Sequence, residues 1–109
     1  MLDELDDAAL DALPFGVVCL DDAMKVVRMN RTESEKSGIQ RWRAVGRDYF
    51  QDVAPGPTNR SLAEHVAAFA QGGGASSRLA HTFHRRAGDD ATQIELRKEH
   101  DRVYLVIHR

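Results

Sequence analysis

The 109-residue sequence predicts an α+β fold built on a single antiparallel five-stranded sheet. Two apolar runs near the N-terminus are separated by a short polar turn, and three more runs lie at the C-terminal end. The stretches before and between these groups show the three- and four-residue spacing of helices. Strands and helices segregated in this way favour one antiparallel sheet with helices packed on its faces. A chain of this length makes one domain around one core.

Residues 1–13 are expected to form an acidic amphipathic helix that caps the main domain, residues 14–109. The apolar residues of this helix recur at helical spacing and are Leu2, Leu5, Ala9, and Ala12 or Leu13. Pro14 ends the pattern. Five of the first eleven residues are acidic and none is basic, whereas the rest of the chain is net positive. The acidic helix can therefore dock on the main domain by charge attraction.

The predicted strands lie at residues 15–20, 24–29, 77–86, 91–98 and 102–108. A turn at Gly88-Asp89-Asp90 is expected to join the third and fourth strands. The last strand is apolar at odd and even positions alike from Val103 to Ile107, so both faces of the sheet need cover. We expect the internal helices to cover one face and the N-terminal helix to cover the other.

Two internal helices have clear sequence signals. Asn30 is a good N-cap for a short polar helix over residues 31–37, which Gly38 stops. A capping box at Ser61 and Glu64 predicts the start of the longest helix. The apolar residues on one face of that helix are Leu62, Val66 and Phe69.

Composition excludes several classes of protein. The single cysteine, Cys19, rules out an internal disulfide, and no Cys/His cluster indicates structural zinc. No apolar stretch is long enough to span a bilayer and the N-terminus is acidic, which favours a cytoplasmic protein without membrane contact. A net charge of -2 without a basic stripe argues against nucleic-acid binding, so Trp42 is interpreted as part of a packed short helix. The absence of phosphate-binding loops and hydrolase motifs predicts a protein that is not an enzyme.

Several short segments from Leu10 onwards match a known pattern. They are Leu10-Asp-Ala-Leu-Pro-Phe-Gly16, Asn30 with Glu33, Gly38, Val45-Gly46-Arg47, Tyr49-Phe-Gln-Asp-Val-Ala-Pro55, and Thr82-Phe83. With these segments the chain resembles the PAS superfamily of sensor domains and, within it, the photoactive yellow protein family. The hexamer from Phe50 to Pro55 is the most specific match. The resemblance implies the PAS fold and a sensory or regulatory function, which the site itself must support.

The family attaches its chromophore, p-coumaric acid, as a thioester to a cysteine just after the Ala-Pro pair. In this chain Gly56 stands there and Pro57 follows, so no covalent chromophore can attach. Cys19 has the strand parity opposite to Val18 and Leu20, and we expect it to face away from the pocket. Cys19 therefore cannot replace the missing anchor.

The resemblance also implies pocket residues. Glu33 falls on a buried glutamate that hydrogen-bonds the chromophore, while Met29 replaces a tyrosine, Ser37 a threonine and Ile39 an arginine. If Glu33 is buried, its pKa is raised. The alternative is that Glu33 is an exposed residue of a polar helix.

Haem is the leading candidate ligand, because PAS domains are known to bind it, usually through a histidine of the long helix. His65 lies on that helix at the edge of the apolar face, and His81 shares strand parity with Phe83 and points into the expected cavity. Either histidine could bind the iron, or each could be a hydrogen-bonded residue at the boundary of the core. His84 has the opposite parity, so it cannot chelate one ion together with His81.

Two functions remain open. The first is a sensor that binds a small molecule non-covalently and signals by releasing the N-terminal helix. Its candidate residues are Glu33, Ser37, His65, His81 and Phe83, with Met29 and Gly56 completing the pocket. The second is a ligand-free interaction module, in which the protein's own side chains fill the pocket. The sheet or the N-terminal helix then forms a homodimer or binds a signalling partner.

Overall fold

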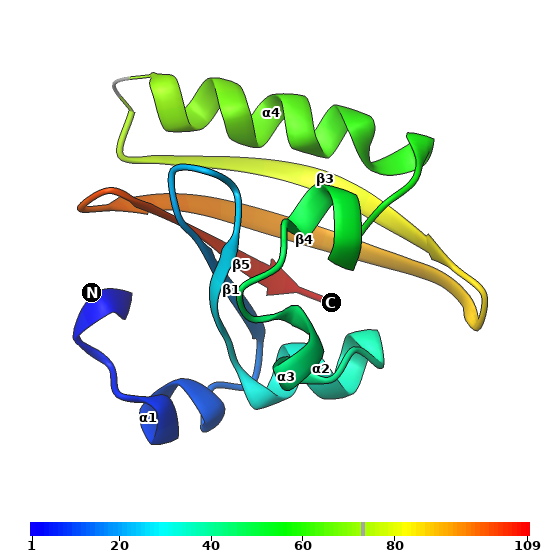
Figure 1. Ribbon diagram of the computed structural model, residues 1–109, viewed down its shortest axis with the longest axis horizontal. Coiled ribbons are helices and arrows are strands. Elements are labelled where there is room, and N and C mark those ends of the chain that lie inside the picture. Colours follow the sequence, from blue (N-terminus) through cyan, green and yellow to red (C-terminus); the bar gives the residue numbers. More distant parts are fainter. Residues whose placement is uncertain (73) are drawn as a thin grey trace.

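The computed structural model describes residues 1–72 and 74–109, and its centre is an antiparallel five-stranded sheet with the strand order β2-β1-β5-β4-β3 (Figure 1). The strands are β1 (Gly16–Leu20), β2 (Val26–Met29), β3 (Ser76–Arg85), β4 (Gly88–Glu99) and β5 (Arg102–His108). The predicted fold class is confirmed. The expected turn at Gly88 is misplaced, because β4 begins at that glycine and the turn falls on Arg86 and Ala87.

The helices are α1 (Asp7–Asp11), α2 (Arg31–Ser37), α3 (Arg41–Ala44) and α4 (Arg60–Gln71). Shorter helical turns span Leu2–Glu4, Tyr49–Val53 and Pro57–Asn59. In α2 the side chain of Asn30 accepts a hydrogen bond from the Glu33 amide, and Gly38 ends the helix with φ +74°, as the sequence predicts. In α3, Trp42 has 73% of its surface exposed, so the expected packing of this residue is wrong. No helix in the described residues is long and apolar enough to cross a membrane.

The sheet is covered on both faces. On one face, α3 and α4 pack over the larger core, to which α4 contributes Leu62, Val66 and Phe69. On the other face, the N-terminal segment packs Leu2 and Leu10 over Val17, Cys19 and Tyr104. Figure 1 shows α4 lying along β3 and β4, with α1 at the opposite end of the molecule. The two-sided cover expected from the last strand is therefore confirmed.

Two other local predictions are wrong. The N-terminal segment is not one helix: Leu5 is extended, and the side chain of Asp6 then begins α1 by accepting a hydrogen bond from Ala9 N at 2.8 Å. The capping box is also absent, because α4 begins one residue earlier than Ser61. The N-cap residue Asn59 makes no capping bond, since its side chain bonds to other elements.

Candidate functional site

Glu33 is buried beneath β1, with only 2% of its surface exposed. Asn30 holds the first turn of α2 in place by accepting hydrogen bonds from the amides of Glu33 and Val17. A Cβ atom added at Gly16 would overlap Oε1 of Glu33, so only glycine lets β1 approach the carboxyl group this closely. Glu33 is therefore an interior residue, as the resemblance implied.

The carboxylate of Glu33 is paired with a guanidinium group. Arg109 donates from Nη1 to Oε1 at 2.8 Å and from Nη2 to Oε2 at 3.3 Å, and its Nε bonds to Asp90 at 3.0 Å. Asp90 also contacts Arg85 at 3.4 Å. Burial raises the pKa of Glu33, and the ion pair with Arg109 opposes that rise. These four residues form an alternating acid–base cluster in which Glu33 already has its partner.

An aromatic pair connects this cluster to the start of α4. The guanidinium group of Arg85 lies 4.7 Å from the centre of the Phe83 ring, and the ring of His81 meets Phe83 edge-on at 4.7 Å. Nε2 of His81 is 2.8 Å from Oδ1 of Asn59. Because the Asn59 amide nitrogen donates to the Ala54 carbonyl, its oxygen accepts and Nε2 of His81 carries the proton. Burial lowers the pKa of His81, which favours the neutral ring.

Asn59 also lines a surface groove at the position where the family attaches its chromophore. The groove has a volume of about 340 Å³ and is lined by Phe50, Gly56, Pro57, Asn59, Arg60 and Ala63. Gly56 has φ +113°, and a Cβ atom there would meet nothing within 4 Å. An unbroken series of contacts thus runs from this groove through Asn59 and His81 to Arg109 and Glu33.

The remaining predicted site residues lie elsewhere. Oγ of Ser37 accepts from Ile39 N at 3.2 Å at the end of α2, and Met29 is buried in the larger core. Nε2 of His65 is 3.1 Å from Oγ of Ser77. His65 follows Asn59 by six residues, or about 9 Å along the helix. It therefore contacts a different part of the boundary between α4 and the sheet from His81.

The interior around His65 and His81 is already filled by side chains, so it leaves no room for a metal ion or haem. Among the described residues, no group of three His, Cys, Asp or Glu side chains is placed to hold a metal ion. A haem bound at Nε2 of His65 or His81 would break the existing hydrogen bond of that histidine. It would also displace side chains of α4 that are buried against the sheet, among them Leu62 and Val66. The packing as it stands does not fit haem.

Sequence reasoning missed the partners of Glu33 and His81. Arg109 shares strand parity with Ile107, and Arg85 shares it with Phe83, so parity alone could have placed both on the helix-covered face. Asp90 lies opposite Phe83 in the register of β3 and β4. Asn59 gave no such signal, because it lies at the end of the helical turn Pro57–Asn59, where strand parity does not apply.

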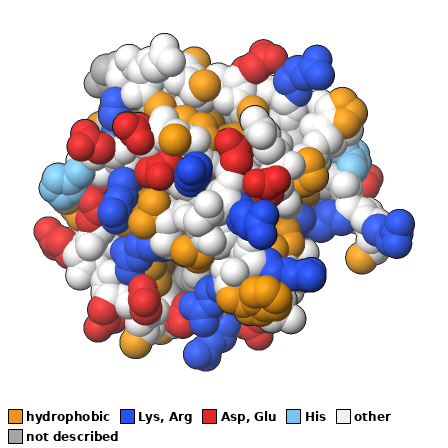
Figure 2. Space-filling model, viewed as in Figure 1, with side chains coloured by type: hydrophobic (Ala, Val, Ile, Leu, Met, Phe, Trp, Pro, Cys, Tyr) orange, Lys and Arg blue, Asp and Glu red, His pale blue; other side chains and the backbone are white. Residues whose placement is uncertain are grey.

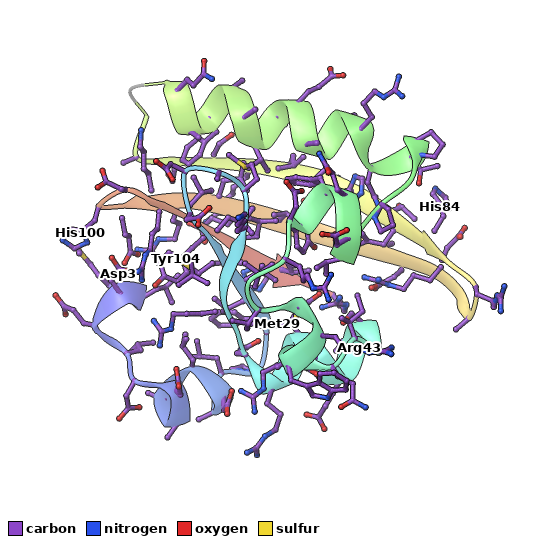
Figure 3. The ribbon with its side chains drawn as sticks, viewed as in Figure 1. Asp3, Met29, Arg43, His84, His100 and Tyr104 are labelled. Carbon is purple, nitrogen blue, oxygen red and sulfur yellow. The ribbon has the colours of Figure 1, made fainter. Side chains whose placement is uncertain are left out.

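The N-terminal segment is fixed to the other face by a polar cluster, which we call the N-terminal latch: Asp3, Arg28, Glu99, His100 and Tyr104. Glu99 accepts from the amides of Leu2 and Asp3 at 3.1 and 2.8 Å. Tyr104 donates to Asp3, which also lies 2.6 Å from Nδ1 of His100 (Figure 3). Arg28 donates to the carbonyls of Leu2 and Leu5. This latch holds the segment in place across the sheet.

Cys19 lies under the latch, on the face away from the groove. Burial raises the pKa of its thiol to about 11, so the reactive thiolate is disfavoured at neutral pH. Cys19 therefore cannot serve as the chromophore anchor, as strand parity predicted.

Comparison with known proteins agrees with this architecture. A family model described as PAS fold matches residues 10–106, and the chain belongs to the PAS family. It is 27% identical over 96 residues to photoactive yellow protein from Rhodobacter capsulatus, covering 88% of this chain and 77% of that protein. It is also 33% identical over 52 residues to photoactive yellow protein from Rhodothalassium salexigens, covering 48% of this chain and 42% of that protein.

Two solved structures are also similar. One is the photoactive yellow protein domain of the sensor histidine kinase Ppr from Rhodospirillum centenum, with a TM-score of 0.81, 27% identity, and coverage of 98% of this chain and 96% of that chain. The other is the PAS domain of the quorum-sensing receptor RpfR from Cronobacter turicensis in complex with BDSF. Its TM-score is 0.75 at 18% identity, covering 88% of this chain and 93% of that one, and it supports the fold alone. The chain is thus a PAS sensory module of the photoactive yellow protein type that lacks the chromophore-attaching cysteine.

Proposed function

We propose that this module binds a small aromatic carboxylate non-covalently in the groove beside Gly56 and reports binding through its N-terminal segment. The groove itself carries the proposal. It lies where the family anchors its chromophore, and its volume of about 340 Å³ falls within the range of small-molecule sites. Phe50 and Pro57 offer apolar walls for a ring, and the guanidinium group of Arg60 offers a partner for a carboxylate.

The contacts beneath the groove support a route for the signal. A ligand that shifts Asn59 disturbs its bond to His81, and the contacts of Phe83 and Arg85 continue from there to Arg109 and Glu33. The buried Nε of Arg85 has no hydrogen-bond partner among the described residues. A rearrangement along this route can give this nitrogen the hydrogen bond that it lacks.

Asn30 supports the last step of the route. Its side chain caps α2 at the Glu33 amide and donates to the carbonyl of Leu10 at 2.8 Å and to that of Phe15 at 3.0 Å. One amide group therefore connects the helix that carries Glu33 to the N-terminal segment. A movement of α2 would be transmitted to that segment and to the latch that holds it.

A PAS domain of similar fold is solved in complex with C12:0, which supports a ligand-binding role for this fold. Haem is a weaker candidate than a small carboxylate, because His65 and His81 use their Nε2 atoms in hydrogen bonds. The ligand-free interaction module remains the second candidate, and the close packing of Leu62 and Val66 against the sheet favours it.

Titration with free p-coumarate, followed by amide NMR spectra, tests the proposal. We expect shifts at Gly56, Asn59 and Ala63 that saturate, and Arg60→Ala should weaken binding by about tenfold, the effect of one lost charged hydrogen bond. Arg86→Ala, which removes an exposed arginine in the β3–β4 turn, is the matched control. If p-coumarate and longer aliphatic carboxylates all leave these amides unshifted, the interaction module is the better account.

A further inference from the structure

A small hollow lies between α2, the start of β1 and the end of β5, close to the buried carboxylate of Glu33. It has a volume of about 160 Å³, which is room for several water molecules or one small anion. Thr32 and Lys36 line it from α2, where a spacing of four residues places them on the same side of the helix. Gly16 of β1 and Arg109, the residue after β5, form further parts of its wall.

The charges around this hollow do not balance. Figure 2 shows acidic side chains lying beside basic ones across the face in view, whereas the described residues that line the hollow include Lys36 and Arg109 but no acid. Behind the wall, Glu33 and Asp90 carry two negative charges while Arg85 and Arg109 carry two positive ones, so this buried cluster is neutral. Lys36 then adds one positive charge that none of the described acids pairs with.

Arg109 has hydrogen-bond donors that its present contacts do not use. A guanidinium group carries five N–H bonds, and the contacts with Glu33 and Asp90 use Nε and one N–H of each terminal nitrogen. Each terminal nitrogen therefore keeps a second N–H that no described residue accepts from. The side chain of Arg109 is 17% exposed, so a ligand can reach it. A guanidinium and the ammonium of Lys36 on one hollow match the acceptor atoms of an oxyanion.

We propose that this hollow binds a small oxyanion between Lys36 and Arg109, at a site separate from the groove beside Gly56. The hollow has less than half the volume of the groove, about 160 against about 340 Å³, so it suits an anion without an aromatic ring. The bound anion and the carboxylate of Glu33 share the guanidinium group of Arg109. Because like charges repel, the anion binds best when Glu33 takes up a proton.

The surroundings of Glu33 favour this coupling to the anion. A Cβ atom at Gly16 would overlap Oε1 of Glu33, so the backbone that forms part of the hollow's wall also touches the carboxyl group. Burial already raises the pKa of Glu33, and burial likewise keeps the nearby phenol of Tyr49 neutral by raising its pKa. The charged groups that face Glu33 from the three neighbouring strands are Arg85 of β3, Asp90 of β4 and Arg109 after β5.

Sulfate is the probe, because it stays fully ionised over the pH range in which a carboxyl group titrates. Added to the full chain at constant ionic strength, it should shift the amides of Gly16 and Thr32 in NMR spectra until they saturate. Lys36→Ala should weaken binding about fivefold, as expected for a partly exposed charge contact. Lys25→Ala, which removes another exposed lysine just before β2, is the matched control. No saturable shift, equal binding by Lys36→Ala, or a loss with Arg60→Ala instead would overturn the proposal.

The competition for Arg109 gives a second test. Glu33→Gln, shown to be folded by circular dichroism, should bind sulfate about fivefold more tightly than wild type at neutral pH. In the wild type, sulfate should raise the pKa of Glu33, read from its carboxyl carbon by ¹³C NMR. This readout is separate from the titration of His108, whose ring packs against Phe15 at the hollow. Unchanged affinity in Glu33→Gln, or the same rise in pKa with sodium chloride of equal ionic strength, would contradict a shared guanidinium group.

Discussion

The two faces of the sheet hold carboxylates in opposite ways. Beneath the helices, Glu33 is enclosed and burial raises its pKa despite the ion pair with Arg109. Under the N-terminal segment, burial alone would raise the pKa of Asp3, but the hydrogen bonds from Tyr104 and His100 outweigh burial and lower it. Lowering the pH therefore removes the unfavourable buried charge of Glu33 on the helix-covered face. On the other face, it weakens the hydrogen bonds that Asp3 makes. We therefore expect acid to release the N-terminal segment while the core stays folded.

The largest expected effect comes from Arg109→Ala. This change leaves Glu33 buried without its partner, which should lower the free energy of unfolding by about 3 kcal/mol, measured by urea denaturation. The part of the penalty that comes from the unpaired Glu33 charge should be absent below the ordinary glutamate pKa of about 4.3 and should grow as pH rises until the folded pKa is passed.

The control for Arg109→Ala is the double variant with Glu33→Gln, which removes the buried charge as well. It should recover a large part of the lost stability at neutral pH and remove the pH dependence that comes from Glu33. Equal stability losses in the single and double variants would show that Glu33 is not the cause.

Gly16→Ala should have the next largest effect, because the new methyl group needs the space of the Glu33 carboxyl group. We expect a loss of about 2 kcal/mol from overpacking and from the weakened Arg109 pair. Gly74→Ala is the matched control, since a Cβ atom there meets only a backbone oxygen at 3.8 Å. Denaturation curves of the two variants that coincide would contradict the close approach of β1 to Glu33.

Glu99→Gln should affect the N-terminal face alone. The amide oxygen keeps one acceptor for the Leu2 and Asp3 amides but loses the charge that strengthens both bonds, at a cost of about 1 kcal/mol. Hydrogen exchange should accelerate at those two amides and remain slow at Val18 in β1. Acceleration throughout the sheet would mean that the latch and the core open together.

The smallest expected effect is the acid response of the latch. Because the folded pKa of Asp3 is lowered, its stabilising contribution is present above the ordinary pKa of about 3.9 and is lost as pH falls through the folded value. Limited proteolysis should therefore release residues 1–6 in acid before the sheet unfolds. Asp3→Asn should remove this dependence, and a variant that still responds like wild type would exclude Asp3 as the titrating group.

The fold was predictable because alternation and caps are local signals. The parity of Val103 to Ile107 predicted cover on both faces, and Asn30 and Gly38 predicted the bounds of α2. The prediction of a single N-terminal helix was wrong because the side chain of Asp6 caps the start of α1. This cap divides the segment in two. The capping box at Ser61 failed because α4 begins at Arg60, before the motif.

The site was only partly predictable from the sequence. Burial of Glu33 followed from the resemblance, but its pairing with Arg109 joins residues 76 positions apart, and no local pattern encodes such a contact. The His81–Asn59 bond likewise depends on how the helical turn Pro57–Asn59 packs against β3. The latch was missed for the same reason, since Asp3 and Tyr104 meet only when the two ends of the chain come together.

Hydrogen exchange at the Leu2 and Asp3 amides, with and without saturating p-coumarate, tests most directly whether the groove controls the N-terminal segment. Both amides donate to Glu99, so their exchange reports the closed latch. We predict faster exchange at both amides in the presence of p-coumarate and unchanged exchange at Val18. Binding at Gly56 that leaves the exchange of Leu2 and Asp3 unchanged would contradict the proposed route from groove to latch.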